Sequence, residues 1–410
     1  MRLREARDLL RLQPPSRDRT GRLLRRCHDI EDLRRAARRR LPRPVFDYVD
    51  GGAEQERSLA GNLDAFTRRR YLPRILGSVA EATTEVRWFG RAAAAPIVLA
   101  PTGYTRMMHP QGELAVARAA RRRGLPYVLS TVATTSIEEV AASGHADLWF
   151  QLYIWRDRRL TIGLVERAAA AGYRVLEITV DTAVPGHRVR DARHGLTVPP
   201  QLSLRALAGI AAHPAYWTRM LRSPALALAN TVGSPGTTGP LTVEELGAQF
   251  DPSITWQDVA AIRDLWPGPL LLKGVIGPED ARRAVDAGVD GLHLSNHGGR
   301  QLDRAVTPVE TVAAVRRAVG EQTFLLVDSG VRHGSDVATA IALGADGAAV
   351  GRPYLYGLMA AGERGVDHAL ALLTTELRRT MQLLGVASVP VLRQAGRGLF
   401  WEEGGDGGAG

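Results

Sequence analysis

The chain has 410 residues, of which 45% are hydrophobic and 23% charged, a balance that excludes a fibrous or largely disordered protein. Its net charge is +10, and its single cysteine, Cys27, excludes a disulfide framework and a zinc site built from thiolates. No segment reaches the roughly 20 apolar residues of a membrane-spanning helix, and the first residues lack the apolar core of a secretory signal. We therefore expect a cytoplasmic protein.

The first segment, residues 1–43, holds 15 arginines and 6 acidic residues and so carries most of the net charge. Ile30, Leu33 and Ala37 follow helical spacing, and we expect a solvated amphipathic arm or a pair of helices. Such an arm could bind the phosphates of a nucleic acid. It lacks aromatic residues for base stacking and is interleaved with acids, so we expect no nucleic-acid partner and keep this function only as a weaker alternative.

Eight short apolar segments follow, at residues 96–100, 127–130, 148–152, 175–180, 270–273, 291–295, 324–328 and 348–350. Helical patterns separate most of them, at 113–123, 136–142, 157–171, 256–265, 278–287, 308–319 and 335–343. Apolar strands alternating with helices indicate a parallel sheet, and eight units over about 250 residues predict an α/β fold, a (β/α)8 TIM barrel, within a domain at 44–390. The alternative is a doubly wound open sheet, but no glycine-rich turn follows the first segment.

The connection after the fourth strand is far longer than an ordinary loop, and we assign an insertion to residues 191–255. Its part 202–229 is apolar and basic, which favours a lid or a peripheral membrane contact, with a plain surface excursion as the alternative. The chain ends in a glycine-rich tail at 391–410. There, Gly405, Gly407 and Gly410 form a G-x-G-x-x-G pattern with no strand before it, which we interpret as disorder.

The active site of a TIM barrel forms at the carboxyl ends of its strands, so the residues that close the apolar segments are the candidates. These residues are unusually polar: Thr102, Ser130, Gln151, Tyr153, Thr179, Asp181, Lys273, Ser295, His297, Arg300 and Asp328. Gly330, Arg332, Gly351 and Arg352 follow the last two strands, where such barrels bind phosphate. We therefore expect a phosphorylated cofactor or substrate.

Three kinds of side chain carry the expected chemistry. His297 is a candidate general base that Asp181 could orient, and Arg188 and Arg300 are candidates for a carboxylate clamp, with surface ion pairs as the alternative for each arginine. Lys273 is the only lysine among the 53 basic residues, which suggests that its position requires an ammonium group. His293 lies four residues before His297, but no acidic pattern accompanies the two, and we expect no metal.

Six motifs resemble, in order, the FMN-dependent L-2-hydroxy acid oxidases and dehydrogenases, a family that includes glycolate oxidase, lactate oxidase, mandelate dehydrogenase and quinone-linked lactate dehydrogenase. They are APTG at 100–103, FQLY at 150–153, TVDT at 179–182, LLKGV at 271–275, SNHGGRQLD at 295–303 and DSGVRHGSD at 328–336. FDYVDGGAE at 46–54 also resembles a tyrosine-bearing segment of the family. The resemblance runs from about residue 29 to residue 386 and is closest to the lactate and mandelate dehydrogenase branch.

The resemblance implies FMN as cofactor and the oxidation of an L-2-hydroxy acid to a 2-keto acid. It implies that His297 is the base and Asp181 its partner. Tyr48 and Tyr153 would hydrogen-bond the substrate, whose carboxylate Arg188 and Arg300 would hold. Lys273 would stabilise the anionic reduced flavin. The residues implied to bind the cofactor are Ala100, Pro101, Thr102, Gly103, Ser130, Gln151, Thr179, Lys273, Ser295, Asp328, Gly330, Arg332, Gly351 and Arg352.

Two departures bear on the subtype. Gly103 replaces an alanine that oxidases of the family often carry beside the flavin, which implies a dehydrogenase that passes electrons to a quinone or another acceptor, with an oxygen-using oxidase as the alternative. Val132 replaces a bulky aromatic residue of glycolate-type members, which implies space for lactate or a larger substrate. Members commonly form homotetramers, and some touch membranes through the connection after strand four. A barrel with altered chemistry, such as oxidation of a peptide-derived amine, is a further alternative that the histidine and the two arginines argue against.

Overall fold

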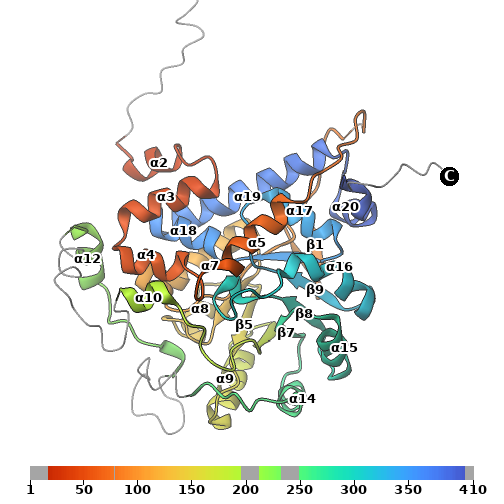
Figure 1. Ribbon diagram of the computed structural model, residues 1–410. Helices are drawn as coiled ribbons and strands as arrows, with labels where there is room; N and C mark the ends of the chain where they lie inside the picture. Colours follow the sequence, from red (N-terminus) through yellow and green to blue (C-terminus); the bar gives the residue numbers. More distant parts are fainter. Residues whose placement is uncertain (1–16, 78, 195–211, 232–248, 402–410) are drawn as a thin grey trace, which may run out of the picture.

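The computed structural model describes residues 17–77, 79–194, 212–231 and 249–401. Its centre is a closed barrel of eight parallel strands, in the order β10-β3-β4-β5-β6-β7-β8-β9 (Figure 1). The strands are β3 (Ile97–Leu99), β4 (Tyr127–Ser130), β5 (Leu148–Leu152), β6 (Val175–Thr179), β7 (Leu270–Val275), β8 (Gly291–Leu294), β9 (Phe324–Val327) and β10 (Gly347–Val350). They overlap all eight predicted segments, so the predicted TIM barrel is confirmed.

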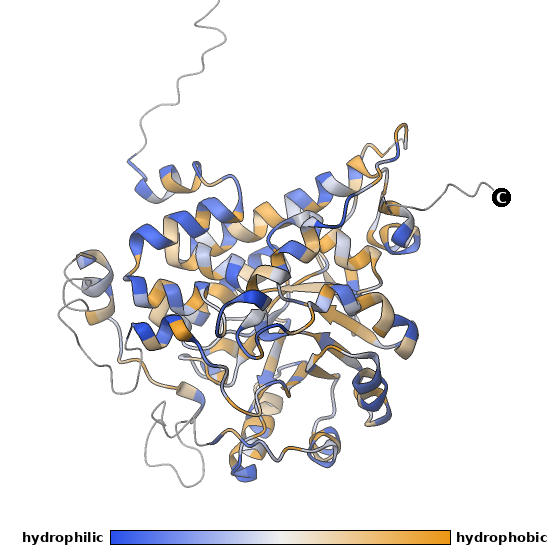
Figure 2. Cartoon of the chain, in the orientation of Figure 1, coloured by the Kyte–Doolittle hydropathy of each residue, from blue (hydrophilic) through white to orange (hydrophobic). Residues whose placement is uncertain are grey.

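The strands read as continuous apolar segments because both of their faces are buried. Successive residues alternate between the barrel interior and the helix side. Val98, Val128 and Leu271 belong to an inner cluster, whereas Leu99 and Leu129 pack in the larger cluster between the strands and the helices. Figure 2 shows this arrangement as mainly hydrophobic strands inside a shell of helices with hydrophilic outer surfaces.

The helices of the barrel are α7 (Gly112–Arg123), α8 (Ile137–Ala141), α9 (Arg158–Ala170), α14 (Trp256–Leu265), α15 (Pro278–Asp286), α16 (Pro308–Val319), α17 (Gly334–Ala342), α18 (Arg352–Ala361) and α19 (Glu363–Leu383), with the short α6 (Thr105–Met108) before α7. Several begin at side chains that cap free backbone N–H groups. Ser136 and Thr255 form capping boxes, and the Asp157 carboxylate accepts a hydrogen bond from Arg159 N.

The described part of the basic arm, residues 17–43, folds as α2 (Arg19–Leu24) and α3 (Ile30–Arg40). One face of α3, with Ile30, Leu33 and Ala37, is buried, and the helix packs against α18 and α19, while its arginines point mainly to the opposite face. This segment is therefore covered on one side rather than solvated all round. α4 (Arg43–Asp50) and α5 (Arg57–Thr67) continue from it to the barrel.

A two-stranded hairpin, β1 (Val86–Trp88) and β2 (Arg91–Ala93), lies at the amino-terminal end of the barrel and was absent from the sequence prediction. It places Trp88 and Phe89 against the interior. The ring of Phe324 lies 5.4 Å from that of Trp88, 4.9 Å from that of Phe89 and 6.3 Å from that of Trp149, measured between centroids. These four aromatic residues close this end of the barrel.

The predicted insertion at 191–255 and tail at 391–410 are described only in part. α10 (Val189–Arg193) runs into the insertion, which also contains α12 (Pro214–Leu221) and η1 (Ala229–Thr231), while 195–211 and 232–248 lie outside the described residues. α20 (Val389–Ala395) and η3 (Gly396–Leu399) occupy the start of the predicted tail, and the G-x-G-x-x-G pattern lies outside the described part. Among the described helices, none has the length and hydropathy needed to span a membrane.

Candidate active site

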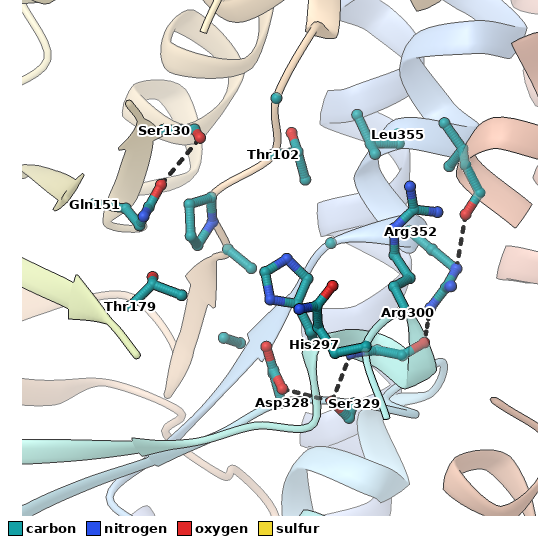
Figure 3. Close-up of a pocket in the computed structure, with 18 of the residues that line it drawn as sticks. Thr102, Ser130, Gln151, Thr179, His297, Arg300, Asp328, Ser329, Arg352 and Leu355 are labelled. Carbon is teal, nitrogen blue, oxygen red and sulfur yellow. Dashed lines mark hydrogen bonds between the residues drawn. The ribbon is translucent and has the colours of Figure 1, made fainter. Parts of the chain in front are cut away.

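A cavity of about 360 Å³ opens at the carboxyl ends of the strands, where the barrel fold places active sites (Figure 3). Almost all predicted site residues line it: Tyr48, Ala100, Pro101, Thr102, Gly103, Ser130, Gln151, Tyr153, Thr179, Arg188, Lys273, His297, Arg300, Asp328, Gly330, Arg332, Gly351 and Arg352. The two exceptions are Asp181 and Ser295. Both contact lining residues from behind, since Asp181 contacts His297, and Ser295 accepts hydrogen bonds from Lys273 and from the His297 backbone.

His297 stands on a tight loop that follows β8. Its backbone φ is +57°, and Gly298 and Gly299 continue in the left-handed region at +66° and +74°. A residue with a side chain adopts this region at an energetic cost, which its surroundings must offset. Here the Ser295 Oγ accepts a hydrogen bond from His297 N at 3.0 Å, and the Ser329 Oγ accepts one from Gly298 N at 3.0 Å. The loop therefore fixes where the imidazole points.

Asn296 holds the same loop in place through hydrogen bonds of its side chain. Its amide exchanges two hydrogen bonds with the amide of Asn62 on α5, at 2.9 and 2.7 Å, and its Oδ1 also accepts from Gly299 N at 3.0 Å. Asn62 is 1% exposed and Asn296 4%. This buried pair connects the amino-terminal helices to the loop that carries His297, and the sequence analysis identified neither residue as functional.

The imidazole of His297 faces the carboxylate of Asp181, with Nδ1 3.0 Å from Oδ1. Burial lowers the pKa of His297, Lys273 acts in the same direction, and Asp181 opposes them only partly, so the pKa lies below its usual value. Burial opposes ionisation of Asp181, but His297 and Lys273 outweigh it, and the pKa of the carboxyl is lowered. The pair is therefore a neutral imidazole beside a carboxylate, which leaves Nε2 as a proton acceptor.

Lys273 lies 3% exposed at the cavity floor, where its Nζ donates a hydrogen bond to Ser295 Oγ at 3.2 Å. Burial alone would lower the pKa of Lys273, but Asp181 and Asp328 raise it above the usual value, so the ammonium stays charged. The next residue, Gly274, has φ +103° at an irregularity of β7, and a Cβ there would lie 2.7 Å from Asp181 Cβ. Only glycine lets the two strand ends approach so closely.

Two arginines flank the ring of Tyr48 at the cavity mouth. The guanidinium carbon of Arg300 lies 4.9 Å and that of Arg188 5.5 Å from the ring centroid, distances typical of cation–π contacts. Arg188 also pairs with Asp191 at 3.3 Å. No carboxylate of the described residues lies within ion-pair distance of Arg300, which donates to the carbonyls of Tyr48 and Gly51. Burial and the neighbouring Arg188 lower its pKa, a sign of uncompensated positive charge.

A third buried guanidinium, that of Arg352, stands at the opposite end of the cavity from Ser130, Gln151 and Thr179 (Figure 3). It donates to the carbonyls of Val49, Gly298 and Gly51 at 2.8 to 2.9 Å, and no carboxylate of the described residues pairs with it. Burial lowers its pKa to about 10. Arg352 also begins α18, whose amino-terminal dipole favours an anion, so this end of the cavity suits a phosphate group.

Orphaned polar atoms mark the other end of the cavity. Gln151 Nε2 and Thr179 Oγ1 are buried and find no hydrogen-bond partner among the described residues, although Gln151 Oε1 accepts from Ser130 Oγ at 3.0 Å. Buried polar groups are normally paired, so these two atoms indicate a ligand with polar edges at this position. The phosphate-suited end, the buried ammonium and these orphaned atoms together fit a flavin mononucleotide.

The cavity also has lining residues that the sequence analysis did not assign. Tyr104 and Phe250 contribute aromatic surface beside Tyr153, whose ring lies 5.3 Å from that of Phe250. Tyr104 has φ +54°, and its buried hydroxyl has no hydrogen-bond partner among the described residues. Phe250 comes from the long connection after β6. Neither residue closes an apolar strand segment, which was the signal that identified the others.

His293 and His297 do not act together, because they face different partners. His293 is fully buried inside the barrel with its Nδ1 2.7 Å from Glu177 Oε2, whereas His297 stands above it beside Asp181. Within the described ranges, no cluster of three His, Cys, Asp or Glu side chains could hold a metal ion.

The fold and cavity define an α/β-barrel enzyme for a phosphorylated cofactor, and comparisons agree. The chain matches the FMN-dependent dehydrogenase family model over residues 37–396. A protein of Mycobacterium tuberculosis (strain ATCC 25618 / H37Rv) is 46% identical over 392 residues, 95% of this chain and 94% of that protein. The L-lactate dehydrogenase of Alcaligenes faecalis is 44% identical over 363 residues, 87% of this chain and 95% of its own length. The solved structure of the monotopic membrane protein (S)-mandelate dehydrogenase has a TM-score of 0.87 and 38% identity, covering 92% of this chain and 100% of that one.

The chain belongs to the family of FMN-dependent dehydrogenases. This confirms the family that the six motifs indicated, and FMN as the cofactor. The protein is therefore an FMN-dependent oxidoreductase.

Proposed function

We propose that this protein oxidises an L-2-hydroxy acid to the corresponding 2-keto acid and passes the electrons through FMN to a quinone or another acceptor. One observation carries the proposal. The Asp181-oriented imidazole of His297 shares a cavity with two guanidinium groups that flank the ring of Tyr48. A base beside a carboxylate-binding pair matches a substrate that carries a hydroxyl next to a carboxylate.

The carboxylate of the substrate is bound by Arg300 and Arg188. Arg300 is buried without a carboxylate partner among the described residues, so an anion that pairs with it offsets the cost of burying its charge. Tyr48 and Tyr153 stand at the same mouth and offer phenolic hydroxyls. Burial raises the pKa of Tyr153, so its hydroxyl stays protonated and can donate a hydrogen bond to the substrate.

His297 accepts the hydroxyl proton at Nε2. The lowered pKa keeps the imidazole neutral at pH 7, which is the form that a base requires. After protonation, the Asp181 carboxylate at Nδ1 stabilises the imidazolium. The loop that fixes the imidazole in the left-handed region keeps this geometry in place.

FMN, when bound, accepts two electrons and gains negative charge on its ring system. We assign the ring end of the cavity to Ala100, Pro101, Thr102, Gly103, Ser130, Gln151 and Thr179, whose orphaned polar atoms offer hydrogen bonds. The phosphate end is assigned to Gly330, Arg332, Gly351 and Arg352. Asp328 lines the cavity between the two ends, and Ser295 supports Lys273 from behind. Lys273 supplies the positive charge that favours the reduced cofactor.

Gly103 supports a dehydrogenase rather than an oxygen-using oxidase. A Cβ at this position would lie 2.5 Å from Val132 Cγ2 and 3.2 Å from Val132 O, so alanine does not fit beside the present Val132. The chain thus keeps glycine where oxidases of the family often have alanine. The small side chain of Val132 also leaves room for lactate or for a larger, mandelate-like substrate.

A peripheral contact with a membrane is the second part of the proposal. α12 lies at the edge of the molecule (Figure 1), and Leu221 and Leu226 beside it are 84% and 43% exposed, with Arg219 and Arg222 as basic neighbours. An exposed apolar and basic helix suits the surface of an anionic membrane. Part of the predicted segment 202–229 lies outside the described residues. A homotetramer stays a prediction.

The test is anaerobic reduction of the bound flavin, measured by its absorbance, with L-lactate, L-mandelate and glycolate as substrates. The D enantiomers of lactate and mandelate, and the corresponding acids without the hydroxyl group, are the controls. We expect bleaching by an L-2-hydroxy acid and rapid reoxidation by a quinone analogue but not by oxygen. Failure of every hydroxy acid to bleach the flavin would overturn the substrate class. Reoxidation by oxygen as fast as by the quinone would overturn the choice of acceptor only.

A further inference from the structure

The layer of side chains directly beneath the cavity contains a buried ion pair that the proposed reaction does not use. Interior positions alternate along each strand, so Glu177 lies two residues before Thr179 on β6, and His293 lies two residues before Ser295 on β8. Both side chains are 0% exposed. The other interior positions of this layer are apolar and include Val128, Leu271, Leu326 and Ala349.

The imidazole of His293 connects two carboxylates. Its Nδ1 hydrogen-bonds Glu177 Oε2 at 2.7 Å, and its Nε2 lies 3.3 Å from Asp328 Oδ2, within ion-pair distance but without a hydrogen-bond partner among the described residues. Asp328 reaches up to the cavity, where its Oδ1 accepts a hydrogen bond from Ser329 Oγ at 2.7 Å. Lys273 is the register partner of His293 across β7 and β8 and is itself buried. Glu177, His293 and Asp328 thus form a row of ionisable groups below the cavity, and Lys273, on the cavity floor, interacts electrostatically with both carboxylates.

The two flanking carboxylates hold His293 in its charged form. Burial would lower the pKa of His293, but Glu177 and Asp328 raise it to about 9. Burial likewise opposes ionisation of Asp328, yet His293 and Lys273 keep the pKa of its carboxyl well below the usual range. With His293 charged, the three carboxylates of Glu177, Asp328 and Asp181 and the cations of Lys273 and His293 sum to −1; with a neutral histidine, the sum would be −2.

A buried ion pair in an apolar layer is rarely worth more to stability than a well-packed apolar pair of similar volume. The charges of Glu177 and His293 therefore call for another explanation, and their position beneath Lys273 offers one. We propose that Glu177 and His293 are positioning residues of the cofactor site: the imidazolium offsets the carboxylate charge beneath the flavin, so that the ammonium of Lys273 remains free to stabilise the reduced cofactor.

The inference rests on FMN occupying this cavity, but not on the hydroxy acid as substrate. It is tested by measuring the midpoint potential of bound FMN during titration with a chemical reductant, without any hydroxy acid, from pH 5.5 to 9.5. The titration therefore remains informative even if no hydroxy acid reduces the flavin. The variants are His293→Gln, Glu177→Gln and the double variant. His145→Gln is the matched control, since His145 is buried but its Nε2 donates a hydrogen bond to Leu125 O, away from the cavity.

We expect the two single variants to shift the midpoint potential of bound FMN in opposite directions. His293→Gln weakens the preference for reduced over oxidised FMN about tenfold at neutral and acid pH, where the wild-type imidazole is charged, because Glu177 is then an unbalanced anion. This is equivalent to about 30 mV for a two-electron couple, and the difference narrows toward pH 9.5, where the wild-type imidazole loses its proton. Glu177→Gln strengthens it by a similar factor at the acid end, where His293 remains charged. The double variant returns to within about threefold of the wild type, and His145→Gln leaves the potential unchanged.

Shifts of the midpoint potential with the same sign in both single variants, or no shift at any pH, would overturn the proposal. Glu177 and His293 would then have only a structural role in the barrel interior. A measurement on the unmodified protein covers the case in which a variant does not fold. Nitrogen NMR of histidine-labelled apoprotein at pH 7.5 should show one buried imidazole protonated on both nitrogens. A neutral His293 in that spectrum would equally refute the inference.

Discussion

The two ends of the barrel interior are built on opposite principles. At the amino-terminal end, Trp88, Phe89, Trp149 and Phe324 pack ring against ring and leave only apolar surface. At the carboxyl end, the interior positions are polar and all buried, and two of their side-chain atoms, Gln151 Nε2 and Thr179 Oγ1, have no hydrogen-bond partner among the described residues. These positions are Ser130, Gln151, Thr179, Lys273, Ser295 and Asp328. One strand, β9, carries both kinds, with Phe324 at its start and Asp328 just past its end.

The amino-terminal ends of the strands therefore contribute mainly to stability, and their carboxyl ends carry the polar groups available for chemistry. Unpaired buried polar groups cost free energy, whereas burial of aromatic surface stabilises the fold. A closed and apolar end allows the other end to keep orphaned atoms and uncompensated guanidinium groups for its ligands. Variants at the two ends should therefore fail in different ways, and the predictions below use that contrast.

The largest effect is expected at the carboxyl end, from His297→Ala. Removal of a general base typically costs about 10²- to 10⁴-fold in rate, and we expect a loss in this range for flavin reduction by the hydroxy acid. FMN binding and the unfolding midpoint should change little, because Asp181 is the only hydrogen-bond partner of the imidazole among the described residues. Stopped-flow absorbance measures the rate. An unchanged rate would remove His297 from the role of base.

The counterpart at the amino-terminal end is Phe324→Ala. Truncation of a buried phenylalanine costs about 3–5 kcal/mol of stability, and this ring is the common partner of three other aromatic residues. We expect a lower midpoint in denaturant unfolding and an unchanged rate of flavin reduction per folded molecule. Leu221→Ala is the control, since Leu221 is 84% exposed, and it should shift stability by less than about 0.5 kcal/mol. A slower reaction with unchanged stability in Phe324→Ala would contradict the separation of the two ends.

A smaller effect at the carboxyl end tests how tightly the flavin side of the cavity is packed. Gly103→Ala introduces a methyl group 2.5 Å from Val132 Cγ2, and overpacking of this kind costs about 1–3 kcal/mol. We expect weaker FMN binding in a titration of the apoprotein. Val132→Ala alone should bind FMN nearly as the wild type does, and the double variant should recover most of the loss. If the double variant binds FMN as weakly as Gly103→Ala, the contact with Val132 is not the cause.

The carboxyl end was also the part that the sequence predicted best. Each apolar segment has a cavity-lining residue at its carboxyl end or within two positions of it, because the closure of the barrel places the ends of all eight strands on one rim. Lys273, Asp328 and Arg352 were found in this way, and the family motifs added Tyr48. The eight strands themselves were predictable because both faces are buried and their segments are continuously apolar.

What the sequence did not reveal depends on contacts between distant segments. The β1–β2 hairpin is two three-residue strands with exposed positions, too short for a periodic signal. Phe250 reaches the cavity from a long connection whose path no local pattern determines. Glu177 and His293 are separated by 116 positions and meet only because β6 and β8 present alternate side chains to the same interior layer.

The smallest effect we predict is a displacement along the pH axis rather than a loss. Burial, together with Lys273, lowers the pKa of His297 below its usual value of 6.5, and only the neutral imidazole can accept a proton. The rate of flavin reduction should therefore stay constant down through pH 6.5 and decline only in more acid solution. A decline that already begins above pH 6.5 would contradict the lowered pKa.

Asp181→Asn sharpens this test, because the carboxylate is the partner that raises the pKa of His297 against burial. Its removal should move the acid decline further toward low pH, even though the rate at neutral pH falls because the imidazolium loses its stabilising anion. A structural defect alone would lower the rate without moving the decline. A shift toward higher pH would mean that Asp181 does not stabilise the protonated imidazole and would contradict its role as the partner of His297.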